Sequence, residues 1–232
     1  MFTLDHIVPW GRSFDEYRRM FGLTDADLAR TIVGCGDGPA SFNAEATARG
    51  TRVVSCDPIY RWGPMQIRER IAATSETILA QTRKNAAEFV WGDEIGSVEK
   101  LGQIRRQAMD AFLEDFEAGK AAGRYVEAEL PTLPFPDGAF DLAVCSHLLF
   151  LYTGQLGEAF HRAAIREMCR VASEVRIFPL LTLGGQRSPY VETGVAEFCG
   201  AGFAVTLERV SYEFQRGGNQ MLRIRRAELT DG

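Results

Sequence analysis

One stretch of this chain, residues 31–57, constrains its fold more than any other. A short apolar run at residues 31–33 stops at a cluster of glycines within residues 34–38, and a helical stretch follows. A second apolar run at residues 52–56 then leads directly to Asp57. Glycine permits the tight turn that joins a strand to a helix. Strand, glycine turn, helix and strand in this order predict a βαβ unit, and therefore a parallel sheet.

The alternation of strand and helix continues after a long helical segment. Residues 61–123 carry apolar residues at helical spacing and no strand pattern, which predicts a helical insertion. Further strands are expected at residues 124–129, 140–145, 175–181, 203–214 and 221–226. The link between the last two is short, so they should form an antiparallel hairpin. We expect a single α/β domain over residues 1–232, with a doubly wound, mostly parallel seven-stranded sheet and a terminal antiparallel hairpin.

Composition and charge narrow the class of function. With 46% hydrophobic and 25% charged residues, the 232-residue chain has the make-up of a soluble globular domain. Its formal net charge of −5 provides no overall positive field, which argues against a nucleic-acid partner. No apolar run approaches the ~20 residues of a membrane span, and no signal-peptide pattern opens the chain. We therefore expect a cytoplasmic protein.

Cysteine and histidine spacing indicates neither disulfides nor a metal site. The cysteines form no CxxC pair and are odd in number, so we predict reduced thiols. They are Cys35, Cys56, Cys145, Cys169 and Cys199. His6, His147 and His161 lack the spacing of metal ligands, and no metal is predicted. His161 lies off the apolar stripe of its predicted helix and is expected at the surface.

The glycine cluster does not match two common nucleotide-binding loops. The dinucleotide fingerprint needs a glycine where this chain has Pro39, which disfavours an NAD-linked oxidoreductase. No Gly-Lys-Ser/Thr follows, which excludes a P-loop. Pro39 should instead open the helix after the turn. A glycine turn can also be a matter of geometry alone, but Asp57 ends the next strand at the same edge of the sheet, where a carboxylate can accept hydrogen bonds from two ribose hydroxyls.

Four elements, taken in order, resemble one enzyme family. They are Val33–Gly38, Asp57, Glu129–Leu130 followed by the run LPFPDG, and the strand FDL at residues 140–142. Together these are similar to class I S-adenosylmethionine-dependent methyltransferases. The run LPFPDGAFDL resembles the small-molecule branch of that superfamily. The resemblance covers about residues 31–60 and 124–181.

The resemblance implies S-adenosylmethionine as cofactor and a small molecule as methyl acceptor. It also implies a set of cofactor contacts. These are Gly34, Cys35, Gly36 and Gly38 beneath the methionine part, Asp57 with Pro58 at the ribose, Ile59 on the adenine, Glu129 and Leu130 at the adenine edge, and Ser146 after the fourth strand. The fourth strand lacks the Asn/Asp-Pro-Pro-aromatic run of enzymes that methylate adenine or amide nitrogens, which disfavours those acceptors.

His147 is the residue we predict to be catalytic. It follows Ser146 at the end of the fourth strand, where this kind of sheet presents side chains to its ligands. Imidazole accepts a proton near neutral pH, so His147 is suited to take a proton from the acceptor. The alternative is that His147 only packs at the strand end and bonds a backbone group.

The helical insertion and two side-chain groups have competing interpretations. We predict that residues 61–123 cover the substrate side of the site as a lid, with a dimerisation surface or a stabilising appendage as alternatives, which leaves a homodimer open. An aromatic group is expected in the core, with a substrate-binding site as the alternative: Phe150, Tyr152, Tyr212 and Phe214. A basic group is expected on a solvated strand face, with a nucleic-acid or phosphate site as the alternative: Arg216, Arg223, Arg225 and Arg226. The alternative to an enzyme is a non-catalytic cofactor-binding regulator or scaffold of the same fold.

Overall fold

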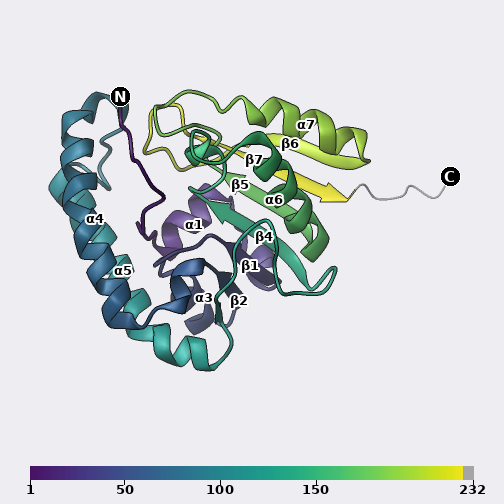
Figure 1. Cartoon of the computed structure of the whole chain (residues 1–232), viewed down its shortest axis with the longest axis horizontal. Coiled ribbons are helices and arrows are strands. Elements are labelled where there is room, and N and C mark those ends of the chain that lie inside the picture. Colours follow the sequence, from purple (N-terminus) through teal and green to yellow (C-terminus); the bar gives the residue numbers. More distant parts are fainter. Residues whose placement is uncertain (227–232) are drawn as a thin grey trace.

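The computed structural model describes residues 1–226 and contains one seven-stranded sheet, in the order β3-β2-β1-β4-β5-β7-β6 (Figure 1). The strands are β1 (Thr31–Cys35), β2 (Arg52–Cys56), β3 (Tyr125–Val126), β4 (Phe140–Ser146), β5 (Ala172–Phe178), β6 (Phe203–Arg209) and β7 (Gln220–Arg226). β7 runs antiparallel to β5 and β6, whereas the other neighbouring strands are parallel. The predicted α/β fold with its terminal antiparallel hairpin is confirmed.

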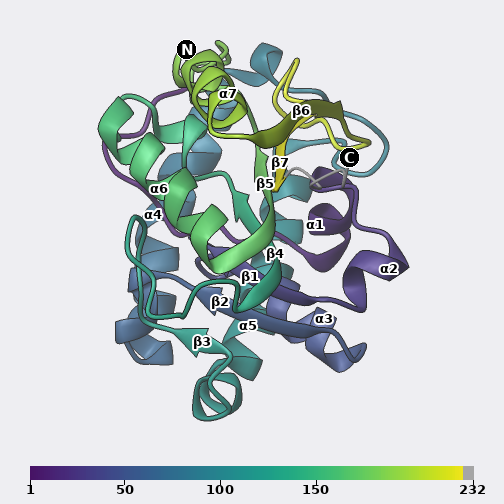
Figure 2. The ribbon, with the colours of Figure 1, turned by 90° about the vertical axis from the view of Figure 1, so that its right-hand side faces the viewer.

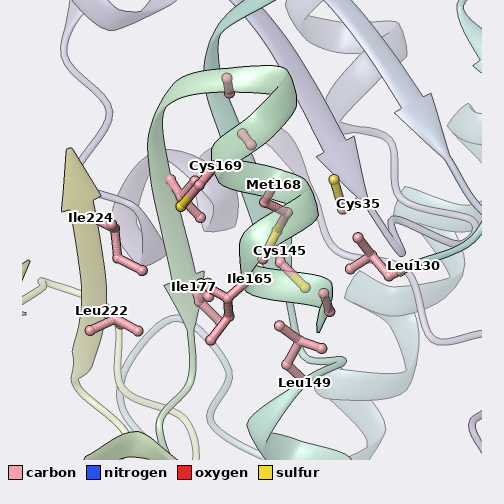
Figure 3. Packing of buried hydrophobic residues seen from close by; sticks show 14 of the residues in the cluster. Cys35, Leu130, Cys145, Leu149, Ile165, Met168, Cys169, Ile177, Leu222 and Ile224 are labelled. Carbon is pink, nitrogen blue, oxygen red and sulfur yellow. The ribbon is translucent and has the colours of Figure 1, made fainter. Parts of the chain in front are cut away.

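Helices cover both faces of the sheet. They are α1 (Phe14–Met20), α2 (Asp25–Leu28), α3 (Phe42–Ala48), α4 (Pro64–Lys84), α5 (Val98–Ala121), α6 (Glu158–Val171) and α7 (Tyr190–Gly200), with short 3-10 helices at Pro58–Arg61, Ala86–Glu88 and Phe150–Tyr152. Figure 2 places α6 and α7 on one side of the sheet and α1 to α3 on the other. Figure 3 shows Ile165 and Met168 of α6 packed beside Cys145 of β4 in the core of the first side.

The helix after the glycine turn begins later than the sequence indicates. We expected Pro39 to open it, but α3 begins at Phe42 with Ser41 in the N-cap position. Gly36 and Gly38 both have left-handed backbone conformations, with φ of 71° and 55°, so the chain keeps turning through Pro39. The Ser41 amide donates to the carbonyl of Arg12 rather than into a helix.

The predicted helical segment, residues 61–123, consists mainly of two long helices, α4 and α5, which pack against different parts of the molecule. α5 lies between β2 and β3 in the chain and packs on α3 and β3, as a crossover helix does, while α4 packs on α5 (Figure 1). A fully buried ion pair joins Arg105 of α5 to Glu16 of α1. None of the helices within residues 1–226 is long and apolar enough to cross a membrane.

Three strands differ in length or position from the prediction. The expected strand at residues 124–129 shortens to β3, because the chain turns away after Val126 and the Thr132 amide donates to the Glu129 carbonyl. The fifth strand starts and ends earlier than expected, at Ala172–Phe178. β6 ends at Arg209 instead of residue 214, because the following residues cross to the loop between α4 and α5, where the Val90 amide donates to the Phe214 carbonyl at 2.7 Å.

His161 is not at the surface, as the sequence suggested, but only 1% exposed. Its ring nitrogens lie at hydrogen-bond distance from two backbone carbonyls, with Nδ1 3.0 Å from Gly157 O and Nε2 2.9 Å from Leu149 O. The packing of α7 and of the loop before α6 buries more of this helix than its apolar stripe indicates.

The two side-chain groups follow the predictions in part. All five cysteines are free thiols, and Cys199 is the exposed one. Phe150, Tyr152 and Tyr212 are buried, as expected, whereas Phe214 is half-buried. Tyr152 and Phe214 both line a cavity. In the arginine group, Arg216, Arg225 and Arg226 are exposed, as expected, although Arg216 lies in the loop before β7 and donates to the Ala87 and Phe89 carbonyls. Arg223 is half-buried and pairs with Glu174.

Candidate active site

A cavity of about 1070 Å³ lies over the carboxyl ends of β1, β2 and β4. Such ends are where ligands bind in open α/β sheets. The N-terminal segment, residues 2–10, passes between α4 and the sheet and forms one wall (Figure 1). We call the part formed by the glycine loop, the end of β2 and the residues after β3 the cofactor half. The remainder, formed by the N-terminal segment, α4 and the loops after β4, β5 and β6, is the acceptor half.

The glycines of the loop have different roles. A Cβ at Gly34 would overlap the carboxylate of Asp37, so Gly34 makes room for that side chain and does not line the cavity. Gly36 and Gly38 do line it, and a Cβ at Gly36 would overlap the side chain of Leu148. The thiol-bearing Cys35 also borders the cavity from a buried position.

Asp37 anchors the glycine loop through its hydrogen bonds to α1 and β2. No sequence pattern indicated this role. The buried Asp37 carboxylate accepts hydrogen bonds from the hydroxyls of Tyr17 at 2.8 Å and Ser55 at 2.5 Å. Burial raises the pKa of the Asp37 carboxyl to about 6 despite these bonds. The loop is therefore tied to both α1 and β2.

Asp57 is held in place by two backbone amides. Its Oδ2 accepts from the Gly38 amide and its Oδ1 from the Ile59 amide, both at 2.8 Å. Burial, with a smaller effect from the charge of Glu129, raises the pKa of Asp57 to about 6. Each carboxylate oxygen has a second lone pair. A pair of ligand hydroxyls can thus bond to Asp57 without displacing the amides.

The other residues predicted to contact the cofactor border the same half of the cavity. Pro58 and Ile59 are half-buried next to Asp57, Leu130 is buried, and Glu129 is exposed at the rim. The structure thus brings together all of the predicted cofactor residues except Gly34, which lies beneath the loop.

His147 lies at the boundary of the two halves. Its backbone is left-handed, with a φ of 53°, and its amide donates to the Phe178 carbonyl at 2.7 Å. Nδ1 is 2.8 Å from the Ser146 hydroxyl, and the ring packs edge-on against Phe178. Burial, with the charges of Arg12 and Arg105, holds the pKa of His147 well below its ordinary value. The ring is therefore neutral at physiological pH.

The acceptor half is lined mainly by apolar and aromatic side chains, of which the sequence singled out only Tyr152 and Phe214. They are Phe2, Leu4, Val8, Trp10, Ala73, Thr74, Ile78, Leu151, Tyr152, Leu183 and Phe214. The Thr74 hydroxyl donates to backbone carbonyls of α4, so it is satisfied within its own helix. A cavity with this lining favours a ligand with a largely apolar body.

Comparison with known proteins identifies the class of this protein. A family model described as a methyltransferase domain matches residues 96–174. An uncharacterized protein of Methanocaldococcus jannaschii, MJ0045, is 33% identical over 227 residues, which cover 97% of this chain and 98% of that protein. The chain belongs to the class I S-adenosylmethionine-dependent methyltransferases, as the order of its sheet also indicates.

Matches to solved structures were also found, at low sequence identity. Magnesium protoporphyrin IX methyltransferase from Synechocystis PCC 6803, with bound S-adenosylmethionine, is 14% identical, with a TM-score of 0.46 and coverage of 92% of this chain and 91% of that one. The protein PH0226 from Pyrococcus horikoshii OT3 is 11% identical, with a TM-score of 0.45 and coverage of 85% and 82%.

The protein is thus an enzyme that uses S-adenosylmethionine, in agreement with the prediction. The residues of the cofactor half fit this group. Asp57 has free acceptor capacity for ribose hydroxyls, and the backbone at Gly36 borders the cavity without a side chain. The bound cofactor supplies an activated methyl group on a sulfonium.

Proposed function

We propose that this enzyme methylates a small molecule with a largely apolar body. The observation that carries the proposal is the continuation of the cavity beyond the cofactor half, into a space lined by apolar side chains. A cavity of about 1070 Å³ is at the upper end of the range for small-molecule sites. That volume is enough for a cofactor and an acceptor side by side.

The proposed cofactor contacts follow from the geometry of the cofactor half. Gly36 and Gly38 would lie beneath the methionine part, Asp57 would accept bonds from the ribose hydroxyls, and Ile59 would pack on the adenine. Pro58 would lie beside Asp57 at the ribose, and Glu129 and Leu130 would complete the adenine end. Ser146 and the buried Cys35 would border the methionine. In this arrangement the chain contributes mainly alignment of the acceptor and exclusion of water.

His147 is proposed as the group that takes the acceptor's proton. Its Nδ1 lies next to the Ser146 hydroxyl, which orients the ring and leaves Nε2 as the remaining nitrogen. A neutral ring has a lone pair to offer, which the lowered pKa of His147 favours. The same low pKa makes it a weak base, so it would serve best an acceptor that loses its proton as the methyl arrives.

We also propose that α4 acts as the cover of the acceptor half. One side of α4 borders the cavity through Ala73, Thr74 and Ile78. The neighbouring helix α5 connects this helical pair to α1 through the ion pair of Arg105 and Glu16. The alternatives to a lid, a dimerisation surface or a stabilising appendage, concern the side of α4 and α5 that faces away from the cavity. A homodimer and a cytoplasmic location stay predictions of the sequence.

The experiment compares two matched variants on α4. Ala73 lines the cavity, whereas Ala72 faces a separate hollow between α4 and α5. We expect Ala73→Phe to abolish methyl transfer from labelled S-adenosylmethionine to the small-molecule fraction of a cell extract, with unchanged affinity for S-adenosylhomocysteine. Ala72→Phe should keep both the methyl transfer and the affinity for S-adenosylhomocysteine. Label transferred by the wild type only to protein or nucleic acid would contradict the proposal.

A further inference from the structure

Arg12 is a cation of the cavity wall that neither the proposed cofactor contacts nor the proposed base uses. It lies between the N-terminal segment and α1, and its carbonyl accepts the amide of Ser41 at 3.0 Å. A Cβ at Gly11 would overlap the Pro39 carbonyl, so the absence of a side chain there lets the chain cross directly against the glycine loop. The backbone thus places Arg12 beside the loop at the boundary of the two halves.

The guanidinium of Arg12 is poorly satisfied by the protein. Nη1 donates to the Trp10 carbonyl, and the buried Nε has no hydrogen-bond partner among the residues that the structure describes. Within residues 1–226, no carboxylate lies at ion-pair distance from Arg12, although twenty other ion-pair contacts are present. A buried donor without a partner is unfavourable, and so is a half-buried charge without a counterion.

The nearby acid is committed to another arginine. Glu16 pairs with Arg105 and also accepts from the Tyr212 hydroxyl at 2.9 Å and the Ser13 amide at 3.0 Å. Burial, together with the charge of Arg105, lowers the pKa of Arg12, which indicates that Glu16 does not offset the cost of burying it. The chain keeps a charge here that its own residues do not neutralise.

We propose that Arg12 binds the carboxylate of a ligand in this cavity. A guanidinium presents a planar fork of donors that matches a carboxylate in two parallel hydrogen bonds. A single carboxylate brings one negative charge, which neutralises Arg12, whereas a phosphate dianion would bring two into a cavity that Asp37 and Asp57 already line. The carboxylate has two sources: the amino-acid end of the cofactor, or the methyl acceptor. The acceptor source rests on the proposed small-molecule function, and the cofactor source does not.

Two ligands that differ in the amino-acid end separate the sources. S-adenosylhomocysteine carries the carboxylate, and 5′-methylthioadenosine has the same nucleoside and thioether without it. If the cofactor is the source, Arg12→Met should weaken S-adenosylhomocysteine binding about 10- to 100-fold in calorimetry and leave methylthioadenosine binding within about twofold. Arg12→Lys, which keeps the charge, should restore part of the loss.

The acceptor source is tested on protein saturated with S-adenosylhomocysteine. There, Arg12→Met should remove the preference of the wild type for benzoate over benzamide, with S-adenosylhomocysteine affinity unchanged. The matched control is Arg70→Met, because Arg70 lines the same cavity but lies over the Trp62 ring, 4.3 Å from its centroid. Arg70→Met should change neither the difference in affinity between S-adenosylhomocysteine and methylthioadenosine nor that between benzoate and benzamide.

Two outcomes would overturn the proposal. The first is an equal loss of affinity for S-adenosylhomocysteine and methylthioadenosine in Arg12→Met, which would assign Arg12 to the shape of the glycine loop. The second is a set of unchanged affinities for all four ligands. A failure of methyl transfer to small molecules leaves the cofactor comparison intact, so the two proposals fail separately.

Discussion

The two halves of the cavity are built in different ways. The cofactor half comes from short stretches that each end a strand: the glycine loop after β1, Asp57 after β2 and Leu130 after β3. The acceptor half comes from segments far apart in the chain, among them Phe2, Ala73 and Phe214. Local backbone geometry therefore positions the first half, and long-range packing positions the second.

Because of this difference, substitutions in the two halves should affect different properties of the protein. Within the cofactor half, hydrogen bonds connect Asp57 to the Ile59 amide of its own turn and to the Gly38 amide of the adjacent glycine loop, so a substitution of Asp57 changes binding directly. The acceptor half depends on distant ties, such as the Arg105–Glu16 pair and the stacking of Phe89 on Phe214 at 4.7 Å. Substitutions in those ties change stability first.

The largest effect is expected at the boundary, from His147→Ala. If His147 accepts the proton of the methyl acceptor, kcat should fall about 10²- to 10⁴-fold while the affinity for S-adenosylhomocysteine is kept. Because the pKa of His147 is low, the activity of the wild type should persist below pH 6.5. His147→Gln separates loss of the base from loss of packing. A normal kcat in folded His147→Ala would leave alignment as the mechanism.

The tie between α5 and α1 should affect stability strongly. Arg105→Met leaves the buried carboxylate of Glu16 without its ion-pair partner, which typically costs about 3–5 kcal/mol of folding free energy. Burial favours the neutral form of Glu16, but the Arg105 charge holds its pKa at about 2, so the contribution of the pair is lost as the pH falls from about 4.5 to 2. Urea unfolding measures the loss, and the double variant with Glu16→Gln should recover part of it. An unchanged unfolding midpoint in Arg105→Met would contradict this role.

In the cofactor half, Asp57→Ala should act mainly on binding. Removing a charged acceptor of the ribose hydroxyls should cost about 1.5–3 kcal/mol of S-adenosylhomocysteine affinity, measured by calorimetry. Thermal unfolding serves as the control, because Asp57 also accepts the amides of Gly38 and Ile59. Equal affinity in the variant and the wild type would remove Asp57 from the cofactor contacts.

The smallest expected effect is a pH dependence that distinguishes the halves. Burial raises the pKa of Asp57 to about 6, so the carboxylate is protonated below that pH and the affinity for S-adenosylhomocysteine should fall by up to about tenfold per pH unit. Stability responds with the opposite sign. A raised carboxyl pKa favours the folded state increasingly as the pH falls from about 6 towards 4. In Asp57→Asn the binding should lose this dependence, apart from the share that Asp37 contributes. An unchanged profile in the variant would exclude Asp57 as its source.

Residues in the cofactor half were accessible to sequence reasoning because the pattern there is local. A glycine turn after one strand and an acid after the next are expected to lie close together at the same edge of the sheet. The structure brings Gly36, Gly38 and Asp57 to one cavity. The same reasoning misplaced the role of Gly34, which makes room for Asp37. It had no means to find Asp37 as an anchor, because the partners Tyr17 and Ser55 lie in other elements.

By itself, the sequence determined the alternation of strands and helices, the antiparallel end of the sheet and the edge of the sheet at which the cavity lies. These follow from hydrophobic period and turn residues, which act over a few positions of the chain. Only the tertiary structure decided that α4 and the N-terminal segment enclose the acceptor half, that His161 is buried and that Arg12 faces the cavity without a counterion. A single side chain carries no periodicity, and its partners are set by the packing of segments that are distant in the chain.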